Sequence, residues 1–389
     1  MAEKSPPPHA IAFIENDYAR ALAEARARKL PLFIDAWAPW CHTCLSLRAY
    51  VFPDPALARY AERFVWLSLD TERESSAPVA SRLGVEGLPT LFVLDPVTEL
   101  QVLKWPGALT AGELSGLLDD AEDAAMHRDV RHAASAALAV DARVTGLSDA
   151  RRFAECVTVA SDEAPRMPPG TALADVLRAG MGCADSLAPD APERARLPAL
   201  AAVGERVLAD PSQPILADDR SDLYDYVVDA LRTLGRAEQA TAVARSWATF
   251  LEAEAARAST PRARAVFDSH RLLAYRALGE PERAIPMLEQ SERDFPGDYN
   301  PPARLATAYL DLKRYDEALA AAKRALERAY GPRKLRIFSL EADILVARGD
   351  TEGARRALRD ALAFAQTTPL PTGYPKLRDA IARRLADLH

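Results

Sequence analysis

Apolar and polar residues follow two different patterns along this chain, and the change comes near residue 125. Up to that point, short apolar runs of strand length are separated by segments with helical periodicity. We expect strands at residues 32–37, 64–69, 91–94 and 100–103. We expect helices at residues 16–28, with Asn16 as the N-cap, and at 41–51, 78–83 and 111–126. This alternation predicts a small mixed sheet covered by helices, an α/β domain over residues 10–125.

Beyond residue 125 no segment carries a convincing strand pattern. Residues 126–160 are rich in alanine and arginine and look helical, and prolines then interrupt the chain repeatedly up to residue 218. We therefore expect short helices joined by loops in a connecting region over residues 126–219.

A short motif recurs after residue 220, and each of its copies ends in an alanine. These alanines are Ala240, Ala284, Ala318 and Ala354. The last three are 34 and 36 residues apart, whereas Ala240 precedes Ala284 by 44 residues, which predicts an insertion of about ten residues. A period near 34 with a tight turn before a small residue is typical of tetratricopeptide repeats. Because one such repeat cannot bury its apolar face alone, we expect a stacked helical solenoid over residues 220–389.

The composition is that of an ordinary globular protein. The 389 residues are enough for two or three domains, and 49% are hydrophobic while 27% are charged. A net charge of −7 gives no general reason to expect a nucleic-acid partner, and no apolar stretch reaches the roughly 18 residues of a membrane span. The first ten residues lack the apolar core of a signal peptide. We therefore expect a cytoplasmic protein, or a periplasmic one if a presequence precedes this sequence.

Two cysteines, Cys41 and Cys44, lie three positions apart directly after the predicted strand at 32–37. The strand would deliver Cys41 to the first turn of a helix, an arrangement that suits thiol–disulfide exchange. A Cys-x-x-Cys pair can also be half of a zinc site, but Cys156 and Cys183 are 27 residues apart in the helical half. We expect no metal and no cofactor, and we interpret Cys156 and Cys183 as ordinary buried thiols.

Residues 10–125 resemble a thioredoxin-fold oxidoreductase in several separated motifs. These motifs are Cys41-His42-Thr43-Cys44, Asp35 on the preceding strand, Leu88-Pro89-Thr90, and Gly107-Ala108-Leu109. Val51-Phe-Pro-Asp-Pro55 is similar to a segment in the C-terminal domain of bacterial thiol:disulfide interchange proteins. The resemblance covers under a third of the chain. It implies an α/β thioredoxin fold, a mixed central sheet with flanking helices, followed by the all-α tetratricopeptide-like solenoid.

The resemblance also implies roles for the residues of the redox motif. Cys41 would be the exposed attacking nucleophile, and Cys44 the more buried resolving thiol. Asp35 matches the buried acid of the family and would accept a proton from Cys44, through water. Pro89 would follow a cis peptide bond and pack beside the cysteines. The predicted catalytic residues are Cys41, Cys44, Asp35 and Pro89.

Three further residues are predicted to contact the substrate or to tune the thiols. The cis bond would leave the backbone of Leu88 free to pair with an extended substrate segment. Trp40 would flank the thiols with an apolar surface. His42 departs from the Gly-Pro dipeptide of thioredoxins, and its cationic form would make the pair more oxidising. Trp66 replaces a lysine near the buried acid, a second departure from the family pattern.

The sequence thus predicts a thiol–disulfide oxidoreductase whose repeats dock protein partners on a concave surface. The implied partners are disulfide- or thiol-containing protein substrates, an upstream electron donor, and a protein on the repeats. The chain contains only two asparagines, Asn16 and Asn300, which argues against a carboxylate clamp built from lysine and asparagine. The alternative function is a tetratricopeptide scaffold that carries a redox-sensing or non-catalytic thioredoxin-like module.

Overall fold

The computed structural model describes residues 11–126, 136–371 and 373–388. These residues form two compact units. The first unit contains the chain up to Trp37 together with Cys41–Leu69 and Gly87–Arg257. The second contains Ala38–Trp40, Asp70–Glu86 and the chain from Ala258 onward. The predicted boundary at residue 219 lies inside a helix of the first unit.

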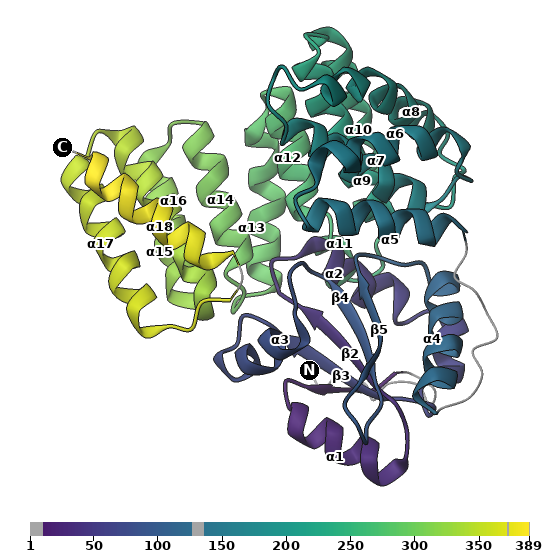
Figure 1. Cartoon of the computed structure of the whole chain (residues 1–389). Coiled ribbons are helices and arrows are strands. Elements are labelled where there is room, and N and C mark those ends of the chain that lie inside the picture. Colours follow the sequence, from purple (N-terminus) through teal and green to yellow (C-terminus); the bar gives the residue numbers. More distant parts are fainter. Residues whose placement is uncertain (1–10, 127–135, 372, 389) are drawn as a thin grey trace. The chain divides into compact units, whose positions relative to one another are not determined.

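A five-stranded mixed sheet forms the core of the N-terminal part, as predicted (Figure 1). The strands are β1 (Phe13–Glu15), β2 (Leu32–Trp37), β3 (Val65–Asp70), β4 (Thr90–Leu94) and β5 (Gln101–Pro106). Their order in the sheet is β1-β3-β2-β4-β5. β1 is parallel to β3, whereas β4 is antiparallel to both β2 and β5. Only β1 had no predicted counterpart, because a strand of three residues is too short to show a periodic pattern.

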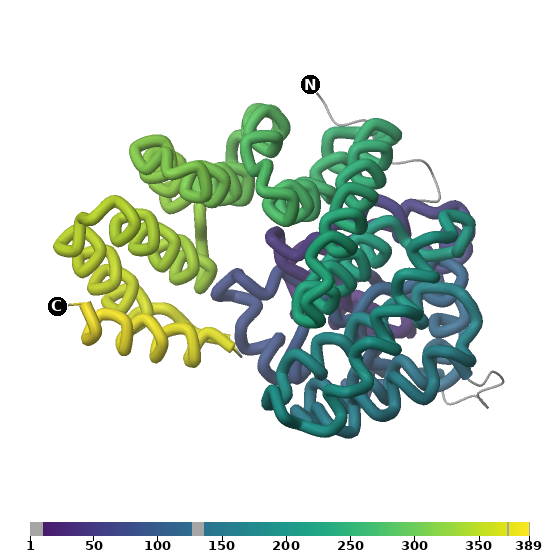
Figure 2. The backbone as a smooth tube through the Cα atoms, turned by 90° about the horizontal axis from the view of Figure 1, so that it is seen from above, coloured from purple at the N-terminus to yellow at the C-terminus, as the bar shows by residue number. Residues whose placement is uncertain are grey.

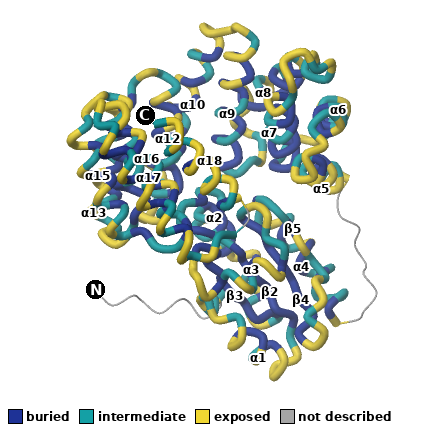
Figure 3. Tube along the Cα trace, turned by 60° about the vertical axis from the view of Figure 1, so that its left-hand side comes forward, coloured by how far each residue is buried: buried dark blue, intermediate teal, exposed yellow. Residues whose placement is uncertain are grey.

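The central strands are buried over nearly their whole length, which explains their continuous apolar runs. Figure 3 shows β2, β3 and β4 in the dark blue of buried residues. Their side chains pack around Phe33, Trp66 and Leu91, and this core continues under helix α4 (Ala111–Ala125) through Leu114 and Leu118. The sheet therefore gives β2, and the motif that follows it, a rigid support.

The helices of the N-terminal part lie close to their predicted positions. They are α1 (Tyr18–Arg28), α2 (His42–Ser46), α3 (Ala77–Leu83) and α4 (Ala111–Ala125). The cap of α1 is Asp17, whose side chain accepts a hydrogen bond from the Arg20 N–H at 3.0 Å. The prediction of Asn16 as the N-cap was wrong, because Asn16 takes a positive φ of 59° just before the cap. The predicted helix over 41–51 continues from α2 into a π-helical turn, η1 (Leu47–Val51). The 3₁₀ turns here are η2 (Pro55–Tyr60) and η3 (Glu74–Ser76).

In the described residues beyond 126, every assigned element is a helix. The first unit contains α5 (Ala136–Asp149), α6 (Phe153–Glu163), α7 (Thr171–Asp185), α8 (Leu197–Ala209), α9 (Ala217–Thr233), α10 (Ala237–Arg257) and the 3₁₀ turns η4 (Ala164–Arg166) and η5 (Pro192–Arg196). The described part of 126–219 is helical, as expected, but α5 to α8 have 11 to 15 residues, so that these helices are of ordinary length and not short. The role of this segment as a connecting region stays a prediction. No helix in the described ranges combines the length and apolar character that crossing a bilayer requires.

Cys156 on α6 and Cys183 on α7 form a disulfide, with their Cα atoms 6.3 Å apart. The interpretation of these residues as free thiols was wrong. Small residues bring the two helices together, since a Cβ on Gly180 would lie 2.6 Å from the Cβ of Ala160. A separation of 27 residues along the chain carries no sign of this close approach. The pairing also removes both residues as ligands for a zinc site.

The second unit contains the helices of the last three predicted repeat motifs (green to yellow in Figure 2), whereas the first motif, which ends at Ala240, lies in the first unit. They are α11 (Pro261–Ala265), α12 (Asp268–Leu278), α13 (Ala284–Asp294), α14 (Asn300–Asp311), α15 (Tyr315–Arg328), α16 (Lys334–Arg348), α17 (Thr351–Thr367) and α18 (Tyr374–Asp387), with the 3₁₀ turns η6 (Pro281–Arg283) and η7 (Gly331–Arg333). Consecutive helices from α12 to α18 pack on one another. The long α10 and the short α11 account for the predicted insertion between Ala240 and Ala284.

The repeat motif has a clear structural basis. The four predicted alanines, Ala240, Ala284, Ala318 and Ala354, are all buried where the paired helices meet. Five residues before each of these alanines, the chain adopts a left-handed conformation in the turn, with φ of 72° at Gly235, 75° at Gly279, 59° at Lys313 and 87° at Gly349. Glycine adopts this conformation without steric cost, which explains why three of the four copies carry it.

Candidate redox site

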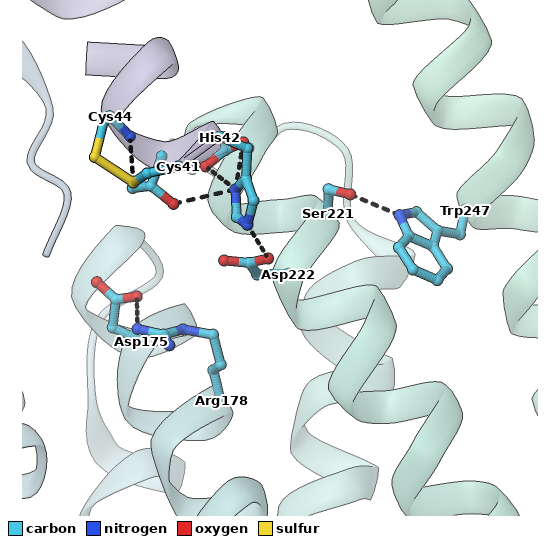
Figure 4. A network of polar contacts seen from close by, with 10 residues as sticks. Cys41, His42, Cys44, Asp175, Arg178, Ser221, Asp222 and Trp247 are labelled. Atoms are coloured by element: carbon cyan, nitrogen blue, oxygen red, sulfur yellow. Dashed lines mark hydrogen bonds and ion pairs between the residues drawn. A yellow bond between two sulfur atoms is a disulfide. The ribbon is translucent and has the colours of Figure 1, made fainter. Parts of the chain in front are cut away.

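Cys41 and Cys44 form a disulfide at the start of α2, with their Cα atoms 5.2 Å apart (Figure 4). Cys41 is the N-cap of α2, and its Sγ accepts a hydrogen bond from the backbone N–H of Cys44 at 3.1 Å. Such a bond stabilises a thiolate at Cys41 in the reduced state. Cys44 is 0% exposed and Cys41 only 5% exposed. Cys44 is the more buried of the two, as predicted, but the prediction of an exposed Cys41 was wrong, because Cys41 is almost as buried as Cys44.

Asp35 lies on β2 and is completely buried, at 0% exposed. Its Oδ2 atom accepts a hydrogen bond from Nη1 of Arg48 at 3.3 Å, whereas Oδ1 has no partner in the described part of the chain. Burial raises the pKa of Asp35 to about 7, and the nearby guanidinium of Arg48 opposes this shift. A carboxyl group with this pKa can both accept and return a proton near neutral pH.

Arg48 is a site residue that the sequence analysis missed. Its guanidinium also donates to Oγ of Ser68 at 2.7 Å and lies 4.2 Å from the ring of Trp37. The indole N–H of Trp37 donates to the same Ser68 oxygen at 2.9 Å. Arg48 therefore brings a positive charge to the buried acid. An arginine on a helix surface is usually solvated, so the pattern alone gave no reason to select it.

Trp66 lies outside the hydrogen-bonded cluster of Asp35, Arg48 and Ser68. It is buried, and its ring centre lies 4.5 Å from that of Phe33 in the core of the sheet. The cation beside Asp35 thus comes from Arg48, on the turn after α2, and not from the position of Trp66 on β3.

The peptide bond between Leu88 and Pro89 is cis, as predicted. The register of the sheet pairs Thr90 with Ala36, which places Pro89 beside the end of β2, where the redox motif follows. The carbonyl of Pro89 accepts a hydrogen bond from the Gly107 N–H at 2.9 Å. The turn at Gly107 and the loop at Pro89, both singled out in the sequence, are therefore joined by a backbone hydrogen bond. Leu88 is half-buried, and its role in substrate binding stays a prediction.

Trp40 belongs to the second unit, where it is fixed by a buried carboxylate. Its indole N–H donates to Oε1 of Glu72 at 2.8 Å, and the guanidinium of Arg333 lies 4.6 Å from its ring. Glu72, 2% exposed, also accepts hydrogen bonds from the Tyr374 hydroxyl at 2.8 Å and the Arg333 N–H at 3.0 Å. Burial raises the pKa of Glu72. Asn300 fixes the same segment by donating from Nδ2 to the carbonyl of Pro39 at 3.1 Å.

His42 contacts two acidic residues of α9. Its Nδ1 atom lies 3.1 Å from both side-chain oxygens of Asp218, and Nε2 lies 3.7 Å from Oδ1 of Asp222. The sequence analysis missed both aspartates, because acidic residues in the first turns of a helix are ordinary N-terminal residues. Nothing in their spacing points to a histidine 176 residues away.

Two segments of the chain match families of known proteins. A thioredoxin-like family model matches residues 13–96, and a tetratricopeptide-repeat model matches residues 299–367. The thiol:disulfide interchange protein DsbD of Cronobacter sakazakii is 38% identical over 82 residues, which are 21% of this chain and 14% of that protein. The chloroplastic thioredoxin-like protein CITRX of Oryza sativa subsp. indica is 26% identical over 93 residues, 24% of this chain and 47% of that protein. The chain therefore spans less than half the length of these curated relatives.

Among solved structures, a thermophilic TPR protein of Thermus thermophilus is similar to this chain. Its sequence identity is 20% and its TM-score 0.32, and the match covers 50% of this chain and 92% of that one. The redox motif and the cis-proline loop lie within the thioredoxin-like match, and α14 to α17 lie within the repeat match. The chain therefore combines an N-terminal thioredoxin-like domain with tetratricopeptide repeats.

Proposed function

We propose that this chain is a thiol–disulfide oxidoreductase that acts on protein substrates. The observation that carries the proposal is the Cys41–Cys44 disulfide, formed at the start of α2 directly after the strand that bears the buried acid Asp35. A relative named as a thiol:disulfide interchange protein is 38% identical to this chain over 82 residues, and the thioredoxin-like model matches residues 13–96, which include the redox motif.

The reaction begins from the reduced pair. The Cys41 thiolate attacks one sulfur of a substrate disulfide, so that a Cys41–substrate bond forms and the substrate S–S bond breaks. The other substrate sulfur leaves as a thiolate and takes up a proton. The Cys44 N–H that points at the Cys41 sulfur favours the thiolate before the attack.

The mixed disulfide is then resolved by Cys44. Asp35 in its carboxylate form accepts the proton of the Cys44 thiol, through water, and the new thiolate attacks Cys41. The Cys41–Cys44 disulfide forms and the second substrate sulfur leaves, so that the substrate has gained two electrons. A dithiol donor restores the reduced pair by the reverse exchange.

The substrate is expected to pass along the proline loop. By its resemblance to thioredoxins, the backbone of Leu88 before Pro89 would pair with an extended segment of the substrate. Tetratricopeptide repeats bind proteins, and here the unit that contains them also contains Trp40, the residue directly before Cys41. We therefore include in the proposal that the repeats recruit the substrate protein.

The test is reduction of insulin disulfides by wild type and by Cys41→Ser, with dithiothreitol as the dithiol donor. We expect the variant to fall to the rate of dithiothreitol alone, and equal rates in both would overturn the proposal. The matched control is Cys156→Ser with Cys183→Ser, which removes the other disulfide and leaves the redox pair intact. In Cys44→Ala, substrates should be trapped as mixed disulfides on Cys41.

A second function is favoured by the 5% exposure of Cys41. A disulfide that is so well covered suits a scaffold that senses redox state through its thioredoxin-like module. The insulin assay separates the two functions, because a sensor would form and break the Cys41–Cys44 bond without catalytic turnover.

We also propose that the protein works in an oxidising compartment such as the periplasm. The buried Cys156–Cys183 disulfide lies outside the redox motif, and structural disulfides persist mainly in such compartments. Acid quenching of intact cells followed by thiol alkylation should find this pair oxidised; a fully reduced pair would place the protein in a reducing compartment.

A further inference from the structure

His42 immediately follows Cys41 in the chain, and two carboxyl groups of α9 surround its ring. Asp218 lies at Nδ1 with both oxygens at 3.1 Å, and Asp222 lies 3.7 Å from Nε2. The three residues belong to one compact unit, in which α2 and α9 are in contact. Figure 4 shows the ring of His42 directed at Asp222 on the helix. These contacts link the redox motif to a helix outside both matched segments.

Asp218 is placed to carry a negative charge although it is only 1% exposed. It is the second residue of α9, in the first turn of the helix. Helix N-termini stabilise anions, because their unpaired N–H groups and the helix dipole present positive charge there. A buried carboxylate also requires a charged or hydrogen-bonded partner, and His42 provides one.

The neighbouring acids of α9 have a different environment. Burial raises the pKa of Asp219 well above its usual range, and burial raises that of Asp225 to about 7. Asp218 and Asp222 are the acidic residues at the two ring nitrogens of His42, and a positive charge on His42 also opposes the effect of burial on the pKa of Asp225. Asp218 lies within hydrogen-bond distance of Nδ1, and Asp222, 3.7 Å from Nε2, lies within ion-pair distance. An acidic side chain on each side of the ring favours the imidazolium, which carries a positive charge and an N–H at both nitrogens.

We propose that Asp218 is a positioning residue for the redox pair, which holds His42 as an imidazolium beside Cys41. This inference rests on the proposed function, for which it names a tuning element. A positive charge next to Cys41 stabilises the thiolate of the reduced form, so the pair becomes a stronger oxidant. The helical region after the thioredoxin-like domain therefore contributes directly to the redox chemistry of the motif.

The negative charge of Asp218 by itself would disfavour the Cys41 thiolate, whereas the His42 imidazolium favours it. These opposite effects give the proposal a sharp test. If Asp218 acted only by its own negative charge, its removal would favour the Cys41 thiolate and make the pair more oxidising. If it acts through His42, its removal makes the pair less oxidising. A double-mutant cycle of Asp218→Asn and His42→Ala separates these two effects, because the effect that acts through His42 vanishes in the His42→Ala background.

The measurement is the equilibrium of the Cys41–Cys44 pair with glutathione at pH 7, read by alkylation of the full chain. In the wild-type background, we expect Asp218→Asn to lower the equilibrium constant for reduction about tenfold, or about 30 mV. In the His42→Ala background, Asp218→Asn should cause no decrease. An equal decrease in both backgrounds, or an increase in the wild-type background, overturns the proposal. The matched control is Asp229→Asn, an exposed acid of the same helix, which should leave the constant unchanged.

A second measurement needs no change at Asp218. The ¹⁵N shifts of the His42 ring at pH 7, assigned by their loss in His42→Ala, should be those of an imidazolium. Shifts of a neutral tautomer contradict the proposal. Both measurements report on the cysteine pair and its neighbour without a protein substrate. A chain without insulin reductase activity would therefore contradict the proposed function and leave this inference open to its own test.

Discussion

Asp35 is a carboxyl group on which burial and a neighbouring charge act in opposite directions. Burial disfavours its ionised form, while the guanidinium of Arg48, 3.3 Å away, favours it. Burial dominates, so that the pKa rises from 3.8 to about 7. The native state consequently binds a proton between these two pH values that the unfolded chain has already released. Asp35 thus costs stability as the pH rises from about 4 to about 7.

We predict that Asp35→Asn is more stable than wild type at pH 8.5, by roughly 2–4 kcal/mol, and differs much less at pH 4. Above pH 7 the wild type contains a buried carboxylate, whereas the amide is neutral at every pH. Urea unfolding of the oxidised protein at both pH values measures the difference. The exposed Asp190→Asn serves as control and should show no pH-dependent change. The same Asp35 variant should resolve mixed disulfides more slowly, since it cannot accept the proton of Cys44.

At the scale of elements, α6 and α7 show how helices of this chain are held together. Gly180 and Ala160 allow a close approach, and the Cys156–Cys183 disulfide joins the two helices inside the core. A cross-link between residues 27 positions apart stabilises the fold mainly by restricting the unfolded chain. The two disulfides in the described residues therefore have different proposed roles: the Cys41–Cys44 disulfide at the start of α2 would exchange with substrates, whereas the disulfide between α6 and α7 would stabilise the fold.

We predict that replacing both Cys156 and Cys183 by alanine lowers the free energy of unfolding by about 3.5 kcal/mol, the loop-entropy value for this separation. Thermal and urea unfolding under oxidising conditions measure the loss. The matched control replaces Cys41 and Cys44 by alanine and should lose only about 1.5 kcal/mol, because that loop is much shorter. Equal losses in the two double variants would contradict the supporting role of the buried disulfide.

At the scale of the whole molecule, the second unit is assembled from distant parts of the sequence. It unites Ala38–Trp40 and Asp70–Glu86 with the repeats, and Glu72 is its main polar junction. Glu72 accepts hydrogen bonds from the indole of Trp40 and from the hydroxyl of Tyr374, which lies 302 positions after Glu72 in the chain. The second unit therefore consists of more than the repeats, since it also includes Ala38–Trp40, directly before the redox motif.

We predict that Glu72→Ala destabilises the second unit by roughly 2–4 kcal/mol, because three donors lose a buried acceptor at once. Those donors are Trp40, Tyr374 and the backbone of Arg333. Tryptophan fluorescence during thermal unfolding follows both the indole environment and the stability. Glu74→Ala removes an exposed acid in the same segment and should behave like wild type. Equal melting temperatures of Glu72→Ala and Glu74→Ala would show that the hydrogen bonds to Glu72 do not stabilise the second unit.

Much of the fold was predictable from local sequence patterns. The strands β2 to β5, the helix pairs of the repeats and the buried alanines all follow from periodicity within about 35 residues. The resemblance to thioredoxins also predicted the buried Asp35 and the cis bond before Pro89. The three-residue strand β1 was missed, because it becomes a strand only by pairing with β3.

The sequence by itself determined the two kinds of architecture and the redox motif within the first of them. Apolar periodicity and the Cys-x-x-Cys spacing are local, so a chain read in order reveals them. Only the tertiary structure decided that Arg48 faces Asp35, that Asp218 and Asp222 face His42, and that Glu72 fixes Trp40. Periodicity specifies which face of an element is apolar. It does not specify which polar side chains meet when distant elements pack, and those meetings define the surroundings of the two cysteines.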